Sequence, residues 1–89
     1  MKQTIKKRLI HRLKILEGQM RGLQRMVEDD VYCIKVLHQS AAAREALSGI
    51  EDFILEDHLS TCVIAQIRSG RSDKPVREVM EVYRLSKHR

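Results

Sequence analysis

The apolar side chains of the first 30 residues recur at the spacing of an α-helix. Steps of four and three residues separate them, in the order Leu9, Leu13, Leu16, Met20, Leu23 and Val27. This spacing puts them on one stripe of a helix that packs along a partner helix. The acidic cluster at residues 28–30 predicts the end of this helix, and Asp29 or Asp30 is expected to be the N-cap of the next one.

A second helical pattern begins near Val31 and meets no proline before a polar connector at residues 69–75. Its length of about 38 residues exceeds that of most globular helices, so we expect a bend or break at Gly49 or at Glu56-Asp57. Pro75 is suited to the first turn of a short third helix. The pattern predicts an all-α fold with two long helices and one short helix, in a single domain over residues 1–89.

The composition agrees with this fold class and limits the kind of protein. Aromatic residues make up 3% of the chain and there is one proline, whereas a β-sandwich or barrel would need more of both aromatics and turn residues. We find no apolar run of membrane length and no signal-peptide core. Two cysteines without a secretory signal predict reduced thiols in a cytoplasmic protein with no membrane partner. So short a chain buries a modest core, which favours self-association.

Positive charge is concentrated at the two ends of the chain. Residues 1–25 carry eight basic groups and one acidic group (+7), residues 26–62 carry two and eight (−6), and residues 63–89 carry seven and three (+4). This distribution predicts a polyanionic partner, most simply nucleic acid. The alternative is that exposed helices are simply rich in Lys and Arg. A helix-turn-helix fits badly, because its helices are short and one of them enters the major groove.

His58 and Cys62 are four residues apart, so on a helix they share a face and can hold one metal ion. Ordinary half-buried packing is the alternative. Cys33 lies 25 residues before His58, which is about 37 Å along one continuous helix. We therefore expect the three to meet only between two copies of this helix, paired antiparallel about a two-fold axis near residue 46. Small residues at 41–43, 46 and 49 would allow close contact there, and the dimer would carry two identical sites.

Two thiolates and one imidazole form a soft set of ligands. They suit Cu(I) well, Zn(II) acceptably, and Mg, Ca or Mn poorly. Two other classes stay open: a thiol redox or sulfur-responsive protein that uses both cysteines, and a purely structural helical oligomer. An enzyme is not expected, because the sequence offers no activated nucleophile, paired carboxylate site or phosphate-binding loop.

Three motifs that together span most of the chain also match a known family. They are Arg12-Leu13-Lys14 with Glu17-Gly18-Gln19 and Gly22, then Tyr32-Cys33 with Gln39, and then Asp57-His58-Leu59 with Cys62. They resemble the CsoR/RcnR family of metal-responsive transcriptional repressors, most closely its copper-sensing CsoR branch.

The resemblance implies a fold, a ligand set and a mechanism. It implies an antiparallel four-helix-bundle dimer that assembles as a dimer of dimers, a homotetramer. Such a protein binds double-stranded operator DNA when metal-free and releases it on binding Cu(I), so that copper-resistance genes are expressed. The matching copper ligands are Cys33 of one chain with His58 and Cys62 of its neighbour. Tyr32 and Glu78 match the two residues that support the ligand histidine.

The DNA-binding residues are expected on the first two helices. Arg12 and Lys14 match basic positions of the family, and the charge pattern adds Lys6, Lys7, Arg8 and Arg21 as phosphate contacts. Some copper sensors carry an arginine in the middle of the second helix, where this chain has Gly49. Arg44 is the substitute on that helix, and how Gly49 alters the DNA contact stays open.

Related sensors of other effectors are the main alternatives. Nickel and cobalt sensors use an N-terminal histidine and usually a histidine in place of Cys62, but the first ten residues here contain no histidine. Persulfide sensors lack the equivalent of His58, and formaldehyde sensors lack the second cysteine. The ligand positions therefore favour copper.

Overall fold

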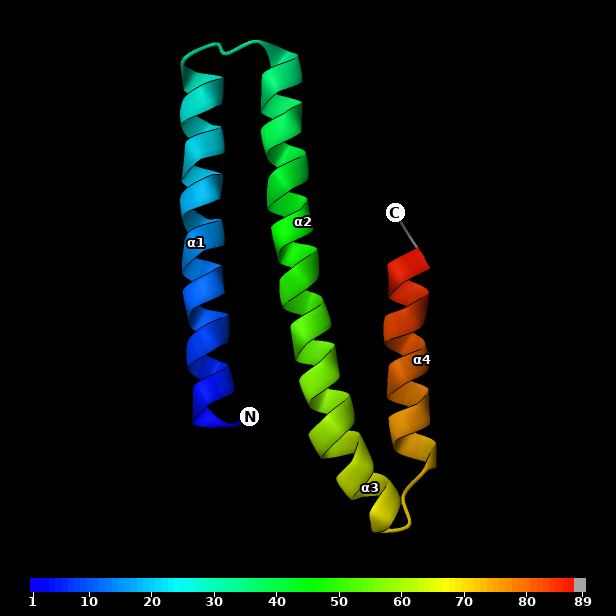
Figure 1. The fold of residues 1–89 in the computed structure, drawn as a ribbon. Coiled ribbons are helices and arrows are strands. Elements are labelled where there is room, and N and C mark those ends of the chain that lie inside the picture. Colours follow the sequence, from blue (N-terminus) through cyan, green and yellow to red (C-terminus); the bar gives the residue numbers. More distant parts are fainter. Residues whose placement is uncertain (88–89) are drawn as a thin grey trace. The chain divides into compact units, whose positions relative to one another are not determined.

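The structure, a computed structural model, describes residues 1–87 and is helical almost throughout (Figure 1). The elements follow one another as α1 (Gln3–Glu28), α2 (Cys33–His58), a π-helical turn η1 (Leu59–Val63), α3 (Ile64–Arg68) and α4 (Asp73–Lys87). The predicted all-α class is confirmed, with two long helical stretches and a short third helix. The chain divides into two compact units, Met1–Ile54 and Leu55–Arg89. The expectation of one domain stays a prediction.

In the first unit, α1 and the larger part of α2 lie side by side and run antiparallel (Figure 1). Leu9 of α1 and Ala43 and Ile50 of α2 are the buried apolar residues of this unit. The predicted stripe of α1 is only partly covered: Leu16 and Leu23 are half-buried. Its remaining three members are exposed, and their exposed fractions rise along the helix from Leu13 (45%) through Met20 (52%) to Val27 (64%).

A left-handed residue, Asp30, ends α1. Its φ is 54°, its N–H donates to the carbonyl of Val27 (3.2 Å), and the N–H of Val31 donates to the carbonyl of Met26 (3.0 Å). These two bonds form a Schellman motif, which satisfies carbonyls at the helix end. The prediction that Asp29 or Asp30 caps α2 was therefore wrong. The first hydrogen bond of α2 is instead made to Tyr32, whose carbonyl accepts the N–H of Lys35 (2.9 Å).

In the second unit, α2 ends at His58, one residue after Glu56-Asp57, which was one of the two predicted places of a bend or break. Gly49, the other place, lies inside α2. The interruption is the π-helical turn η1, and two hydroxyls bond the carbonyls just before it: Ser60 donates to Glu56 (2.8 Å) and Thr61 donates to Asp57 (2.7 Å). Ser and Thr hydroxyls that bond the preceding turn compete with regular helix bonding and bend helices. This gives a physical reason for the position of the break.

The connector between α3 and α4 lies where it was predicted but is shorter, residues 69–72, because α4 already begins at Asp73. Gly70 has φ 88°, and its N–H donates to the carbonyl of Ile67 (3.0 Å) in a second Schellman motif. Pro75 lies in the first turn of α4 and is fully buried. No helix within residues 1–87 combines the length and the apolar character that crossing a membrane requires.

Candidate metal and DNA sites

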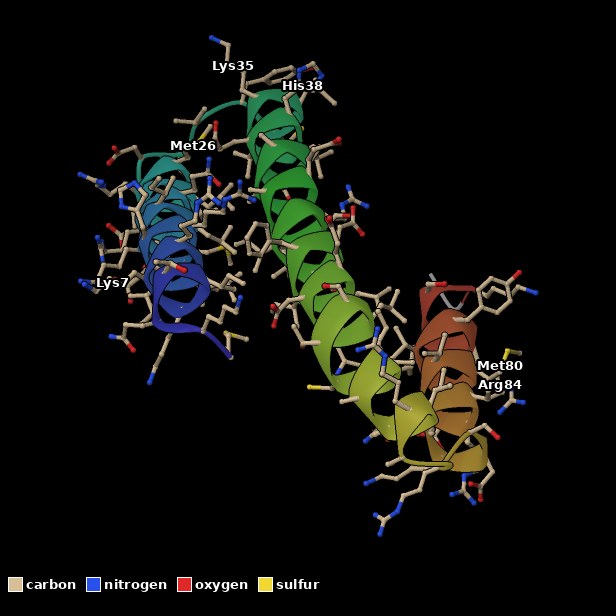
Figure 2. The ribbon with its side chains drawn as sticks, turned by 60° about the horizontal axis from the view of Figure 1, so that its bottom comes forward. Lys7, Met26, Lys35, His38, Met80 and Arg84 are labelled. Carbon is tan, nitrogen blue, oxygen red and sulfur yellow. The ribbon has the colours of Figure 1, made fainter. Side chains whose placement is uncertain are left out.

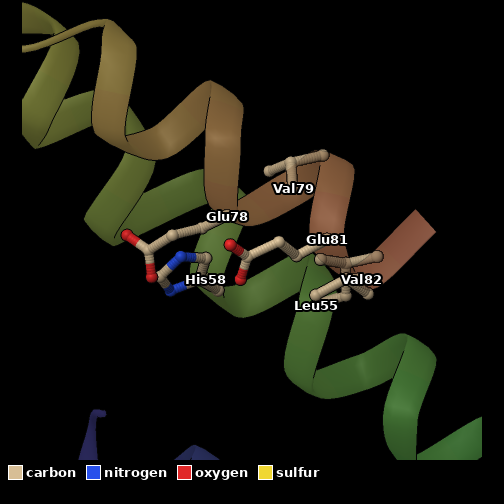
Figure 3. Close-up of a pocket in the computed structure, with 6 residues that line it drawn as sticks. All are labelled: Leu55, His58, Glu78, Val79, Glu81 and Val82. Carbon is tan, nitrogen blue, oxygen red and sulfur yellow. The ribbon is translucent and has the colours of Figure 1, made fainter. Parts of the chain in front are cut away.

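His58, the last residue of α2, is half-buried beside α4. It lines a cavity of about 160 Å³ with Leu55, Glu78, Val79, Glu81 and Val82 (Figure 3). The carboxylates of Glu78 and Glu81 both point toward the imidazole in Figure 3. A carboxylate beside a ligand histidine can accept one ring N–H and leave the other nitrogen for a metal.

The structure thus brings Glu78 close to His58, which the resemblance had implied. Glu81 is a second carboxylate on the same cavity that the sequence analysis did not single out. The sequence already showed that Glu78 and Glu81 are three residues apart and so share one face of a helix. It did not show that this face lies beside His58. Tyr32 does not line this cavity; it lies in the first unit with 68% of its surface exposed.

Cys33 is the first residue of α2 and is exposed. It borders an open, mainly apolar hollow of about 430 Å³, whose other lining residues are Val27, Asp30, Val31, Val36 and Leu37. An exposed thiol such as that of Cys33 is accessible to a soft metal ion, whose other ligands would have to come from outside this hollow.

Cys62 lies within η1, also exposed, with the hydroxyl of Thr61 3.7 Å from its Sγ. Both cysteines are free thiols. Among residues 1–87 of one chain, no group of three or more His, Cys, Asp or Glu side chains lies close enough to hold a metal ion. The set Cys33, His58 and Cys62 therefore stays a prediction that requires a second chain.

The donor atoms themselves fit a soft monovalent ion. Two accessible thiols and one imidazole held beside carboxylates make up a sulfur-rich set of low coordination number, which suits Cu(I). Glu78 and Glu81 line the same cavity as His58, and a carboxylate in that place suits the orienting of a ligand imidazole better than the binding of a soft metal ion.

The predicted DNA contacts are all exposed and all lie in the first unit: Lys6, Lys7, Arg8, Arg12, Lys14, Arg21 and Arg44. Lys7, Lys14 and Arg21 recur every seven residues, so they share one side of α1, and Lys7 points away from α2 in Figure 2. Arg25 continues this side although the sequence analysis did not select it. Arg21 forms an exposed ion pair with Glu17 (3.1 Å). An exposed ion pair of this kind contributes little to stability, so Arg21 can give up Glu17 for a phosphate at small cost.

Arg8 and Arg12 are held differently, against an aromatic ring. The guanidinium carbons lie 5.9 Å and 5.1 Å from the centre of the Phe53 ring, on α2. Gly49 lies one helical turn before Phe53, and a Cβ there would meet no atom within 4 Å. The first carbon of a side chain at Gly49 would therefore meet no obstacle in this chain.

We compared the chain with family models, with characterised proteins and with solved structures. The family model described as metal-sensitive transcriptional repressor matches residues 5–85. The copper-sensing transcriptional repressor CsoR of Bacillus subtilis is 39% identical over 79 residues, which are 89% of this chain and 78% of that protein. The copper-sensing transcriptional repressor RicR of Mycobacterium tuberculosis is 46% identical over 59 residues, 66% of this chain and 62% of that protein.

A solved structure is similar over nearly the full length. The crystal structure of the copper-sensing repressor CsoR with Cu(I) from Geobacillus thermodenitrificans has a TM-score of 0.93 to this chain. The sequences are 38% identical, and the match covers 98% of this chain and 91% of the other.

Proposed function

The chain belongs to the family of metal-sensitive transcriptional repressors, and from this premise we propose that it is a copper(I)-responsive repressor. Metal-free, it binds operator DNA; with Cu(I), it releases the DNA and copper-resistance genes are expressed. The observation that carries the proposal is that this chain has two free thiols and a carboxylate-flanked imidazole among its described residues, and that its relatives are copper sensors. The chain is not an enzyme, since the family consists of transcriptional repressors.

A second copy of the chain is part of the proposal. Leu13, Met20 and Val27 recur every seven residues on α1 and are each at least 45% exposed, so they form an apolar stripe suited to another helix. We infer a two-fold dimer that pairs again into a homotetramer.

The metal site is proposed to lie between the two chains of the dimer. Cys33 opens α2 and His58 closes it, and a helix of 26 residues is about 39 Å long. Antiparallel pairing of two α2 helices brings the start of one to the end of the other. Cys33 of one chain then completes the set with His58 and Cys62 of the neighbouring chain. Bound Cu(I) would link these three donors, while Glu78 fixes the orientation of His58.

The DNA surface is proposed to be the basic side of the first unit. Its lysines and arginines release counterions from the phosphates and supply affinity with little sequence information. Allosteric couplings are typically about 1–3 kcal/mol, so we expect metal to weaken DNA binding by roughly 5- to 150-fold. A protein that binds chromosomal DNA and keeps its thiols reduced is expected in the cytoplasm.

An anaerobic Cu(I) titration tests the proposal. The reduced protein is first used to select a duplex from a random-sequence DNA pool, and release of that duplex is followed by fluorescence anisotropy. We expect uptake of one Cu(I) per chain together with DNA release. Cys33→Ala and Cys62→Ala should keep DNA binding and lose the response to copper.

Each other outcome has a definite meaning. Release by Ni(II), by persulfide or by formaldehyde but not by Cu(I) would keep the family and assign another effector. Failure of a folded cysteine variant to bind the duplex would show that the thiol serves DNA binding and not metal sensing. Oxidant-dependent crosslinking without tight Cu(I) binding would favour a thiol redox protein.

A further inference from the structure

Phe53 is the one phenylalanine of the chain, and it lies half-buried on α2 beneath two arginines of α1. Arg8 and Arg12 are four residues apart, so they share one side of α1. Their guanidinium carbons are 5.9 Å and 5.1 Å from the ring centre, both within the range of a cation–π contact. One ring on α2 thus contacts two cations on α1.

This arrangement leaves the arginines able to bind an anion. A guanidinium beside an aromatic ring does not use its N–H groups on the ring, so they can still donate two parallel bonds to a phosphate. In the part of the chain that the structure describes, neither Arg8 nor Arg12 has a carboxylate within ion-pair distance, whereas Arg21 has Glu17. The two charges on the ring are therefore not neutralised locally.

The side of α2 next to the ring is also open. Gly49 is one turn before Phe53, so both lie on the same side of α2, and a Cβ at Gly49 would meet no atom outside its own stretch of helix within 4 Å. No side chain from this position competes for the guanidinium groups. α2 thus contributes an aromatic face at a point where it carries no charge of its own.

We propose that Phe53 is a positioning residue for DNA binding, and that it holds Arg8 and Arg12 ready for backbone phosphates. The inference rests on the proposed function, in which these arginines contact operator DNA. An arginine that is already restrained loses less side-chain freedom on binding, and this loss is a main cost of ordering long side chains at an interface. The ring lowers that cost for two arginines at once.

Three variants separate this role from simple packing. Phe53→Leu keeps an apolar side chain but removes the ring face, Phe53→Tyr keeps the ring, and Arg8→Ala/Arg12→Ala removes the cations. Affinity of the metal-free protein for the selected duplex is measured for each variant. Phe53→Leu is also measured in the Arg8→Ala/Arg12→Ala background, which completes a double-mutant cycle.

We expect Phe53→Leu to weaken DNA binding by about 5- to 30-fold. Phe53→Tyr, which keeps the ring, should bind DNA as tightly as the unchanged protein. In the Arg8→Ala/Arg12→Ala background, Phe53→Leu should change affinity by less than about twofold, because the partners of the ring are gone. Cu(I) affinity should stay the same in every variant. Urea unfolding of Phe53→Leu and Phe53→Tyr shows whether a difference in stability accompanies the loss.

Two results would overturn the inference. If Phe53→Leu lowers DNA affinity equally with and without the arginines, Phe53 acts through packing alone. The same conclusion follows if Phe53→Tyr loses as much DNA affinity as Phe53→Leu. If Arg8→Ala/Arg12→Ala binds DNA as tightly as the unchanged protein, the arginines are not DNA contacts, and that part of the proposed function fails with it. A protein that selects no duplex at all refutes the proposed function itself.

Discussion

Mixing two variants that each lack one thiol tests whether the metal site is shared between chains. Cys33→Ala keeps His58 and Cys62, whereas Cys62→Ala keeps Cys33. Neither homodimer can assemble a complete site. A dimer with one chain of each kind contains one complete site, formed by Cys33 of one chain with His58 and Cys62 of the other. Its second position has no thiol.

The expected magnitude follows from the position of the ligands on α2. Because Cys33 opens α2 and His58 closes it, about 37 Å apart along the helix, the site depends on which chains pair. Random re-pairing makes about half of all dimers mixed, each with one site in place of two. The mixture should therefore bind about a quarter of the Cu(I) that the unchanged protein binds, while each variant alone binds none tightly.

The assay is an anaerobic competition with a coloured Cu(I) chelator after the two variants are unfolded, mixed and refolded together. A matched control mixes the unchanged protein with a Cys33→Ala/Cys62→Ala chain. A shared site predicts about a quarter of full capacity for that control, because only the unchanged homodimers carry complete sites. A site within one chain predicts about half for the control and nothing for the first mixture. That second pair of results would refute the two-chain site.

Five further substitutions test three other parts of the molecule. Glu78→Gln removes the carboxylate charge beside His58 and should lower Cu(I) affinity by about 10- to 100-fold with unchanged affinity for DNA; Glu81→Gln measures the second carboxylate, and unchanged copper affinity in both variants would contradict an orienting role. Gly49→Arg adds a Cβ that meets no neighbouring atom and should steepen the salt dependence of DNA binding by about 0.9 per added phosphate contact, so an unchanged slope argues against α2 facing DNA. Gly70→Ala places a side chain on a residue with φ 88° and should lower the free energy of unfolding, measured in urea, by about 1–2 kcal/mol. Asp30→Gly changes the matching position after α1 and should leave the free energy of unfolding unchanged or higher. A loss of stability in both variants would contradict the proposed role of a left-handed residue at these helix ends.

The helices and most of their ends could be predicted because local interactions determine them. The three- and four-residue spacing from Leu9 onward, the connector that ends in Pro75, and the break after Glu56-Asp57 all depend on neighbours within one or two turns. Two local predictions were wrong: α4 begins at Asp73, inside the predicted connector, and Asp30 ends α1 and does not cap α2. An aspartate suits both an N-cap and a left-handed C-terminal position, so its type alone does not decide between them.

The candidate metal ligands were also recognisable in the sequence, since thiols and imidazoles are rare and their spacing is specific. Their assembly was not. The structure places Cys33 and Cys62 as exposed free thiols and His58 beside α4, but bringing all three together depends on a second chain. That part of the site stays a prediction, because spacing along one chain does not determine the contacts between two.

Tertiary structure alone decided which side chains from different helices meet. It placed Glu81 on the cavity of His58, and Phe53 beneath Arg8 and Arg12, about 40 residues away in sequence. It also divided the apolar stripe of α1 into a covered part at Leu9 and an open part at Val27. The physical reason is the same in each case. Helical periodicity fixes which residues share a side of one helix, but the rotation and offset of two packed helices depend on how all their side chains fit together.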